Sequence, residues 1–268
     1  MNKAARIFVA GRRGLVGSAL YRVLQARGFS RLLGPSREEL DLRDQAAVES
    51  FFSEQQPEYV FVAAARVGGI LANDMYPADF IRDNLQIQTN VIDAAFRHGV
   101  RKLCFLGSSC VYPRLAPQPI EEHALLSGPL ESTNQWYAVA KIAGIKMCQA
   151  YAKQHRFNAI SLMPTNLYGP GDNFDLQTAH VLPALIRKFH EARAARSPSV
   201  TVWGSGSPRR EFLYVDDLAD AACFLMASYH LPDVVNVGVG TDISIAELAA
   251  TIREIVGFDG EIVFDPTK

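Results

Sequence analysis

The stretch Ile7-Phe8-Val9-Ala10-Gly11-Arg12-Arg13-Gly14-Leu15-Val16-Gly17 decides the fold of this chain. Its first four residues are apolar and predict a buried β-strand. Glycines spaced three residues apart follow, and the apolar residues after them recur with helical spacing, so the glycine turn joins a strand to the N-terminus of a helix. Glycines at such a turn let the backbone approach a pyrophosphate, and the amide groups of the helix face its charge. The stretch therefore predicts an α/β protein that binds a dinucleotide.

Further apolar runs predict more strands, and segments with helical spacing separate them. The predicted strands lie at residues 31–33, 59–65 and 103–106. Strands that alternate with helices predict a doubly wound parallel sheet, and sites in such sheets lie at the carboxyl ends of the strands. The strand at 59–65 runs into Ala63-Ala64-Ala65, whose small side chains would let a cofactor lie against the backbone, although small residues also simply pack well.

The segment from Asp79 to Gly99 predicts a long helix with more apolar surface than one contact with a sheet needs. Its apolar residues include Phe80, Leu85, Ile87, Val91, Ile92, Ala95 and Phe96. We expect the excess face to pair with a second subunit, which predicts a homodimer.

The residues after the second strand bear on the choice between NAD and NADP. An NAD-specific protein places an acidic residue there, about 20 residues past the glycine turn, to hold the ribose hydroxyls. This chain has Gly34-Pro35-Ser36-Arg37 instead, and Arg13 lies within the glycine turn. Guanidinium groups favour the additional phosphate of NADP, so the pattern predicts NADP(H). In the alternative, both arginines are solvated and Glu38 or Glu39 takes the acidic role.

The segment Tyr137-Ala138-Val139-Ala140-Lys141 places a phenol and an ammonium one turn apart on the same face of a helix. A nearby cation stabilises a phenolate, so the lysine is expected to lower the tyrosine pKa toward neutrality and to make the phenol a proton donor. The same pattern is common on helix surfaces by chance. The strand end at Gly107-Ser108-Ser109-Cys110 favours the catalytic interpretation, because sites form at that edge of the sheet.

Composition argues against several classes of protein. The 268 residues carry 27 basic and 28 acidic side chains, so the net charge of −1 gives no argument for binding nucleic acid or an anionic membrane. Cys104, Cys110, Cys148 and Cys223 are scattered, which favours reduced thiols in the cytoplasm. No spacing typical of metal ligands is present. We expect a cytoplasmic protein without a signal peptide, since the N-terminus runs into a strand and no apolar run has the roughly 20 residues of a membrane span.

Six motifs extend from the glycine turn to the last third of the chain. They are GRRGLVG at 11–17, ARVGGI at 65–70, LGSSCVYP at 106–113, YAVAKIAG at 137–144, MPTNLYGP at 163–170 and VWGSG at 202–206. Together they resemble the extended short-chain dehydrogenase/reductase family over essentially the whole chain. Within this family, the resemblance is to enzymes that epimerise and reduce GDP-linked 4-keto-6-deoxy sugars. The glycine turn is shared by many relatives, whereas the combination of the Ser-Ser-Cys motif, the MPTNLYGP motif and a histidine at 180 occurs in far fewer.

The resemblance implies a reaction in two parts. Protons are removed and returned at the carbons on either side of a 4-ketone, which inverts both, and NADPH then reduces the ketone. The family's acid and base match Cys110 and His180, and both a thiolate and an imidazole are plausible near neutral pH. Ser108 and Tyr137 would hold the ketone oxygen, with Lys141 beside them. From the residues alone, Cys110 could also be a small core residue and His180 a helix cap.

The resemblance also implies which residues bind the cofactor and the substrate. We expect NADP(H) to contact Gly11, Arg13, Gly14, Leu15, Val16, Gly17, Arg37, Asp41, Leu42, Ala63, Ala64, Ala65, Leu106, Gly107, Ser108, Tyr137, Lys141, Pro164, Asn166, Leu167 and His180. We expect Lys188, Trp203 and Arg210 to bind the GDP-sugar, with the arginine fork on the diphosphate. In the alternative, Arg209 and Arg210 form a solvated turn.

The alternating pattern changes near residue 171, which predicts two domains. An NADP-binding Rossmann domain is expected over 1–170, with 211–240 returning to it, and a smaller substrate-binding domain over 171–210 and 241–268. Members of the resembled family continue for several more helices, so we expect this substrate domain to be incomplete. Two rival functions stay open: another nucleotide-sugar epimerase of the same fold with tightly bound NAD, and a non-catalytic protein that senses dinucleotides.

Overall fold

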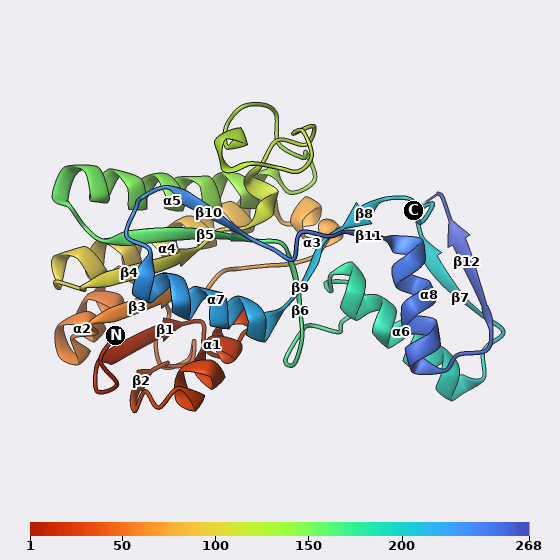
Figure 1. The fold of residues 1–268 in the computed structure, drawn as a ribbon, viewed down its shortest axis with the longest axis horizontal. Coiled ribbons are helices and arrows are strands. Elements are labelled where there is room, and N and C mark those ends of the chain that lie inside the picture. The colour runs from red at the N-terminus through yellow and green to blue at the C-terminus, as the bar shows by residue number, and fades with distance from the viewer. Residues whose placement is uncertain (268) are drawn as a thin grey trace.

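A six-stranded parallel sheet forms the centre of the larger part of the molecule (Figure 1). The computed structural model describes residues 1–267, apart from the side chains at positions 70 and 71. The strand order is β10-β5-β4-β3-β1-β2, and each neighbouring pair is parallel, which confirms the predicted doubly wound sheet. The strands are β1 (Arg6–Ala10), β2 (Arg31–Leu33), β3 (Tyr59–Val62), β4 (Lys102–Leu106), β5 (Ala159–Pro164) and β10 (Val234–Val237).

Helices cover both faces of this sheet because the strands are apolar on both sides. In β1, Ile7 and Val9 pack on one face, whereas Phe8 and Ala10 pack on the other. The face of Ile7 meets α1 (Leu15–Ala26) and α7 (Val215–Ser228). The opposite face meets α2 (Gln45–Gln55), α4 (Pro77–Arg97) and α5 (Gln135–His155). The glycine turn, the long helix and the helix of Tyr137 thus lie where the sequence predicts them.

Some predicted boundaries shift for local reasons. The helix expected over 79–99 begins at Pro77, whose fixed φ suits a first helical position, and ends at Arg97 ahead of Gly99, which has a φ of +69°. The strand expected over 59–65 ends at Val62, because the three alanines leave the sheet toward α3 (Ile70–Met75). The 3₁₀ turns η1 (Ser109–Val111) and η2 (Glu122–Ala124) follow β4.

A second, smaller core lies at the other end of the molecule, beside the C-terminus (Figure 1). It joins α6 (Val181–Ala195) and α8 (Ile245–Val256) to the parallel pair β7 (Ser199–Trp203) and β12 (Glu261–Asp265). Two further strand pairs join segments distant in sequence: β6 (Asn166–Tyr168) with β9 (Phe212–Tyr214), and β8 (Arg209–Arg210) with β11 (Ile243–Ser244). The division into two domains at the boundaries given above stays a prediction. The last residue of the predicted substrate domain, Lys268, lies outside the described residues.

The described residues contain neither a membrane-spanning helix nor a cluster of metal ligands. Between residues 1 and 267 no helix combines the length and the apolar composition of a membrane span. Within the same residues no three His, Cys, Asp or Glu side chains are grouped closely enough to hold a metal ion.

Candidate active site

The glycine turn between β1 and α1 is shaped by close backbone contacts. Gly11 has a φ of +87°, and a Cβ there would come within 2.8 Å of Cα of Ala64 in the loop after β3. A Cβ on Gly17 would overlap the carbonyl oxygen of Gly11. Gly14 is the N-cap of α1 and no side chain caps that end, so the first amide groups of the helix remain available to an anion. These residues fit the pyrophosphate of a dinucleotide.

Charged side chains surround the turn after β2, where the ribose of a dinucleotide is expected. An Arg13 guanidinium nitrogen lies 3.2 Å from a Glu38 carboxylate oxygen, but both side chains are about three-quarters exposed (75% and 76%), so this pair contributes little. The Glu39 carboxylate accepts a hydrogen bond from the Ser36 amide at 2.6 Å. Arg37 is exposed. Both acidic residues of the alternative interpretation thus have local partners, while Arg37 faces solvent beside the turn.

The Tyr137–Lys141 pair lies on α5, against the carboxyl end of β4. Lys141 is 3% exposed, and its Nζ donates a hydrogen bond to the Leu106 carbonyl oxygen at 2.8 Å. Nζ also lies 5.8 Å from the centre of the Tyr137 ring. Burial lowers the pKa of Lys141 to about 8 and raises the pKa of Tyr137 above its ordinary value. The expectation that Lys141 lowers the tyrosine pKa is therefore wrong for this structure, because the loss of solvent around the phenol outweighs the nearby cation.

Ser108 and Cys110 follow β4 directly. Ser108 is the N-cap of η1, and its Oγ accepts a hydrogen bond from the Cys110 amide at 3.4 Å. Burial raises the pKa of the Cys110 thiol to about 11, against the opposing effects of Ser108 and the Lys141 ammonium. The expected thiolate near neutral pH is thus corrected to a protonated thiol. The other three cysteines are buried, whereas Cys110 keeps partial exposure, which separates it from a core residue.

His180 is the N-cap residue of α6, yet its side chain makes no capping hydrogen bond. The interpretation of His180 as a simple helix cap is therefore wrong for this structure. The protein around His180 lowers its pKa, although the residue as a whole is exposed, and the carboxylate of Asp172 opposes that shift. The direction of the shift favours the neutral imidazole. The structure brings together Ser108, Cys110, Tyr137 and Lys141. His180 lies on a separate segment, which contacts the loop after β3 through Thr178 and Ala179.

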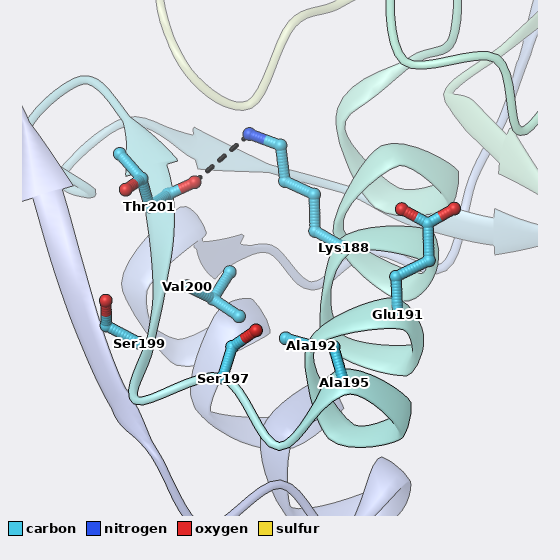
Figure 2. A pocket seen from close by; sticks show the side chains of 8 residues that line it. All are labelled: Lys188, Glu191, Ala192, Ala195, Ser197, Ser199, Val200 and Thr201. Carbon is cyan, nitrogen blue, oxygen red and sulfur yellow. Dashed lines mark hydrogen bonds between the residues drawn. The ribbon is translucent and has the colours of Figure 1, made fainter.

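The residues predicted to bind the substrate lie on the smaller core. Lys188 Nζ sits 4.6 Å from the centre of the Trp203 ring and donates a hydrogen bond to the Thr201 carbonyl oxygen at 3.1 Å, as Figure 2 shows for Lys188 and Thr201. A hollow of about 340 Å³ opens between α6 and β7 beside Lys188, and none of the predicted catalytic residues lines it. Arg210 is exposed on β8, whereas its neighbour Arg209 forms an ion pair with Asp242, with 2.8 Å between the Arg209 Nε and the Asp242 Oδ1.

Sequence reasoning missed a group of polar residues behind the site. Asp83 and Asn84 on α4 are buried among apolar residues and contact the loop that follows β3. A signal was present, because they stand three and four positions after Phe80 and therefore lie on the buried face of the helix.

The chain matches most of the length of known proteins that resemble it. The family model described as "NAD dependent epimerase/dehydratase family" matches residues 7–238. The chain is 63% identical over its whole length to "Putative GDP-L-fucose synthase 2" from Arabidopsis thaliana, covering 82% of that protein. It is 52% identical over 98% of its length to "GDP-L-fucose synthase" from Escherichia coli, covering 85% of it.

A solved structure resembles this one in its fold as well as its sequence. The GDP-mannoheptose C4 reductase from Campylobacter jejuni with NADP bound superposes with a TM-score of 0.91 at 41% identity, over 99% of this chain and 89% of that one. The family match and these similarities agree with the parallel sheet. The chain belongs to the NAD dependent epimerase/dehydratase family.

Proposed function

We propose that this chain is an NADPH-dependent enzyme that converts GDP-4-keto-6-deoxy-D-mannose into GDP-L-fucose. It would invert carbons 3 and 5 of the sugar and then reduce the ketone at carbon 4. The observation that carries the proposal is the identity of 52–63% with relatives named GDP-L-fucose synthase, over nearly the whole chain. A cytoplasmic location is part of the proposal, because it suits a chain whose four cysteines are free.

The cofactor side of the site fits a dinucleotide phosphate. Gly11, Gly14 and Gly17 leave the space that a pyrophosphate needs, and the uncapped N-terminus of α1 supplies amide donors. Arg37 and Arg13 lie where a ribose phosphate would be recognised, which favours NADPH over NADH. The bound cofactor supplies the hydride.

The pKa shifts of Cys110 and His180 support different roles for them in the inversion. The pKa of the thiol is raised to about 11 and that of the imidazole is lowered, so at neutral pH the thiol carries a proton and the imidazole can accept one. His180 would take a proton from a carbon beside the ketone, and Cys110 would return one to the opposite face. The electron pair of the broken C–H bond moves onto the ketone oxygen in between.

Ser108 and Tyr137 would hold that oxygen. Hydrogen-bond donors aimed at a developing oxyanion stabilise it strongly when solvent is excluded. The raised pKa of Tyr137 keeps the phenol protonated, so it can donate its proton to the oxygen when the ketone is reduced. Lys141, fixed by the Leu106 carbonyl, holds a positive charge beside the ring.

A reductase without epimerase activity is the second candidate. The similarity to a GDP-mannoheptose C4 reductase favours it, since that protein shares 41% of its residues with this chain. The purified chain, incubated with GDP-4-keto-6-deoxy-D-mannose and NADP⁺ in D₂O, should incorporate deuterium at carbons 3 and 5. When NADPH is then added, it should be consumed with GDP-L-fucose as product. NADPH consumption without deuterium incorporation would favour the reductase, and neither signal would refute both.

A further inference from the structure

The loop after β3, residues 63–69, joins the glycine turn to the segment that carries His180. At its first end, Ala64 packs against Gly11. At its other end, the Gly69 amide donates a hydrogen bond to the Thr178 carbonyl oxygen at 2.9 Å. A Cβ on Gly69 would come within 2.7 Å of the Ala179 carbonyl oxygen, so the loop and the peptide just before His180 are in close contact. A displacement of this loop would therefore displace His180.

Asn84 of α4 holds the backbone in the middle of the loop. Its Oδ1 accepts a hydrogen bond from the Arg66 amide at 2.9 Å, and its Nδ2 donates to the Arg66 carbonyl oxygen at 3.0 Å. Nδ2 also donates to the Phe80 carbonyl oxygen at 2.8 Å within α4. Asn84 is 2% exposed, so these bonds form without competing water. The Asn84 side chain thus binds both the amide and the carbonyl group of Arg66 and holds loop 63–69 against α4.

Asp83 holds the side chain of the same loop residue. Its carboxylate lies 2.9 Å from Arg66, 2.8 Å from Arg82 and 3.6 Å from Arg43. Burial raises the pKa of Asp83, but hydrogen bonds from Arg66 and Arg82 more than offset this effect and keep the pKa below its usual value. The carboxylate therefore stays ionised and paired, and Arg66 is fixed through its side chain as well as its backbone.

Asn73 of α3 completes the support nearest to His180. Its Nδ2 donates hydrogen bonds to the carbonyl oxygens of Gly68 at 2.6 Å and Gly69 at 3.0 Å. The residue is 6% exposed. The loop is thus held at Arg66 by α4, at Gly68 and Gly69 by α3, and is bonded from Gly69 to the His180 segment.

We propose that Asn84, Asp83 and Asn73 are positioning residues that set the place of His180 for proton transfer through loop 63–69. This inference rests on the proposed function, because it assigns these residues to the inversion and not to hydride transfer. None of them touches the reacting atoms. Their effect passes along the chain of bonds from α4 to Arg66, Gly69 and Thr178.

The test compares variants of the full chain by two measurements. Deuterium incorporation at carbons 3 and 5 of GDP-4-keto-6-deoxy-D-mannose is followed in D₂O at saturating NADP⁺, and NADPH binding is followed by fluorescence titration. We expect Asn84→Ala to slow deuterium incorporation by ~10-fold or more at saturating NADP⁺, because the acid–base geometry is lost. Any loss of NADPH affinity should be smaller than this, since Ala64 still packs against Gly11 at the other end of the loop. Gly69→Ala should do the same by displacing Ala179, with Asn84 intact.

Asn90→Ala is the matched control on the same helix. The Asn90 Nδ2 donates to the Leu42 carbonyl oxygen at 2.9 Å and so supports a loop that is expected to contact NADP(H) and not the His180 segment. At saturating NADP⁺, deuterium incorporation by Asn90→Ala should therefore match that of the unsubstituted chain. If Asn84→Ala and Gly69→Ala incorporate deuterium as fast as the unsubstituted chain, the inference is wrong but the proposed function stands. The same conclusion follows if Asn84→Ala, Gly69→Ala and Asn90→Ala all lose incorporation equally. Absence of incorporation in the unsubstituted chain would overturn the proposed function as well. If Asn84→Ala fails to fold, Gly69→Ala decides.

Discussion

Cys110 lies close enough to Tyr137 to raise the pKa of the phenol, yet the proposed chemistry gives the two residues different atoms of the substrate. Cys110 moves a proton at carbon, whereas Tyr137 gives a proton to oxygen. Removing each should therefore damage a different step.

Cys110→Ser keeps the size of the side chain but replaces the thiol with a much weaker acid. Deuterium incorporation should fall by the ~10²- to 10⁴-fold typical of losing a general acid or base, while reduction of the uninverted ketone persists. Tyr137→Phe should show the reverse, with incorporation continuing and NADPH oxidation lost. Both rates are measured on the same samples. Inversion at the normal rate in Cys110→Ser would reduce that cysteine to a packing role.

The lowered pKa of His180 predicts the acid side of the pH profile for deuterium incorporation. The imidazole stays neutral, and so able to accept a proton, down to a pH below its ordinary value of 6.5. The rate should therefore hold through neutrality and fall only below pH 6.5. Asp172 raises the pKa of the histidine by its charge, so Asp172→Asn should move the acid limb to still lower pH. An acid limb centred above pH 6.5, the ordinary pKa of histidine, would contradict the role of His180 as the base. So would an acid limb that Asp172→Asn does not shift.

Arg37 should discriminate between the two nicotinamide cofactors. Arg37→Ala is expected to weaken NADPH binding by ~1.5–3 kcal/mol, the range for hydrogen bonds to charged groups, and to leave NADH binding nearly unchanged. Titration of each cofactor by fluorescence measures this. Arg31→Ala, an exposed arginine at the start of β2, is the control and should affect neither. Equal losses for both cofactors in Arg37→Ala would refute the role.

The end of helix α7 depends on a lysine from a distant strand. Lys102 of β4 is 2% exposed, and its Nζ donates hydrogen bonds to the carbonyl oxygens of Leu225 at 3.0 Å and Met226 at 2.8 Å, as well as to that of Tyr229. The Leu225 carbonyl also accepts the Tyr229 amide, whereas the Met226 carbonyl is one of those that a helix leaves without a partner at its C-terminus. The lysine thus joins the end of α7 to the start of β4.

Lys102→Met should therefore destabilise the fold without changing the site. Leaving buried carbonyl groups without donors costs about 1–3 kcal/mol of unfolding free energy, which urea denaturation measures. Lys146→Met on α5 is the matched control, because Lys146 is exposed and bonds only to Gln149 at 3.0 Å, so its change should stay within about 0.5 kcal/mol. A Lys102→Met protein as stable as the unsubstituted chain would show that solvent replaces the lysine.

The assembly of the whole molecule is expected to use α4 and α5. These helices lie side by side on one face of the sheet, and Trp136 and Val139 of α5 remain 43% and 42% exposed. We expect them to pair with their symmetry mates in a two-fold dimer. Val139→Glu should produce a monomer of unchanged stability, whereas the unsubstituted chain should show a dimer mass in sedimentation. A monomer mass of the unsubstituted chain at every concentration would rule out the dimer.

Local patterns were enough to predict the parallel sheet and the position of its turns. The apolar run of β1, the glycines that follow it and the helical spacing of α1 depend on residues near one another in the chain, and each confines the backbone by its own steric or apolar preference. The Tyr137–Lys141 spacing likewise depends on a single helix.

The protonation states of the candidate site and the support of its loops followed from distant contacts. Burial raised the pKa of Tyr137 against the expectation from its neighbouring lysine, because the surrounding protein removes solvent from the phenol. Asn84 lies 18 residues from the Arg66 backbone that it binds, and Lys102 lies more than 120 residues from the helix end that it caps. Such effects depend on which segments the fold brings together and how much water it excludes, and neither quantity can be calculated from the spacing of residues along the chain.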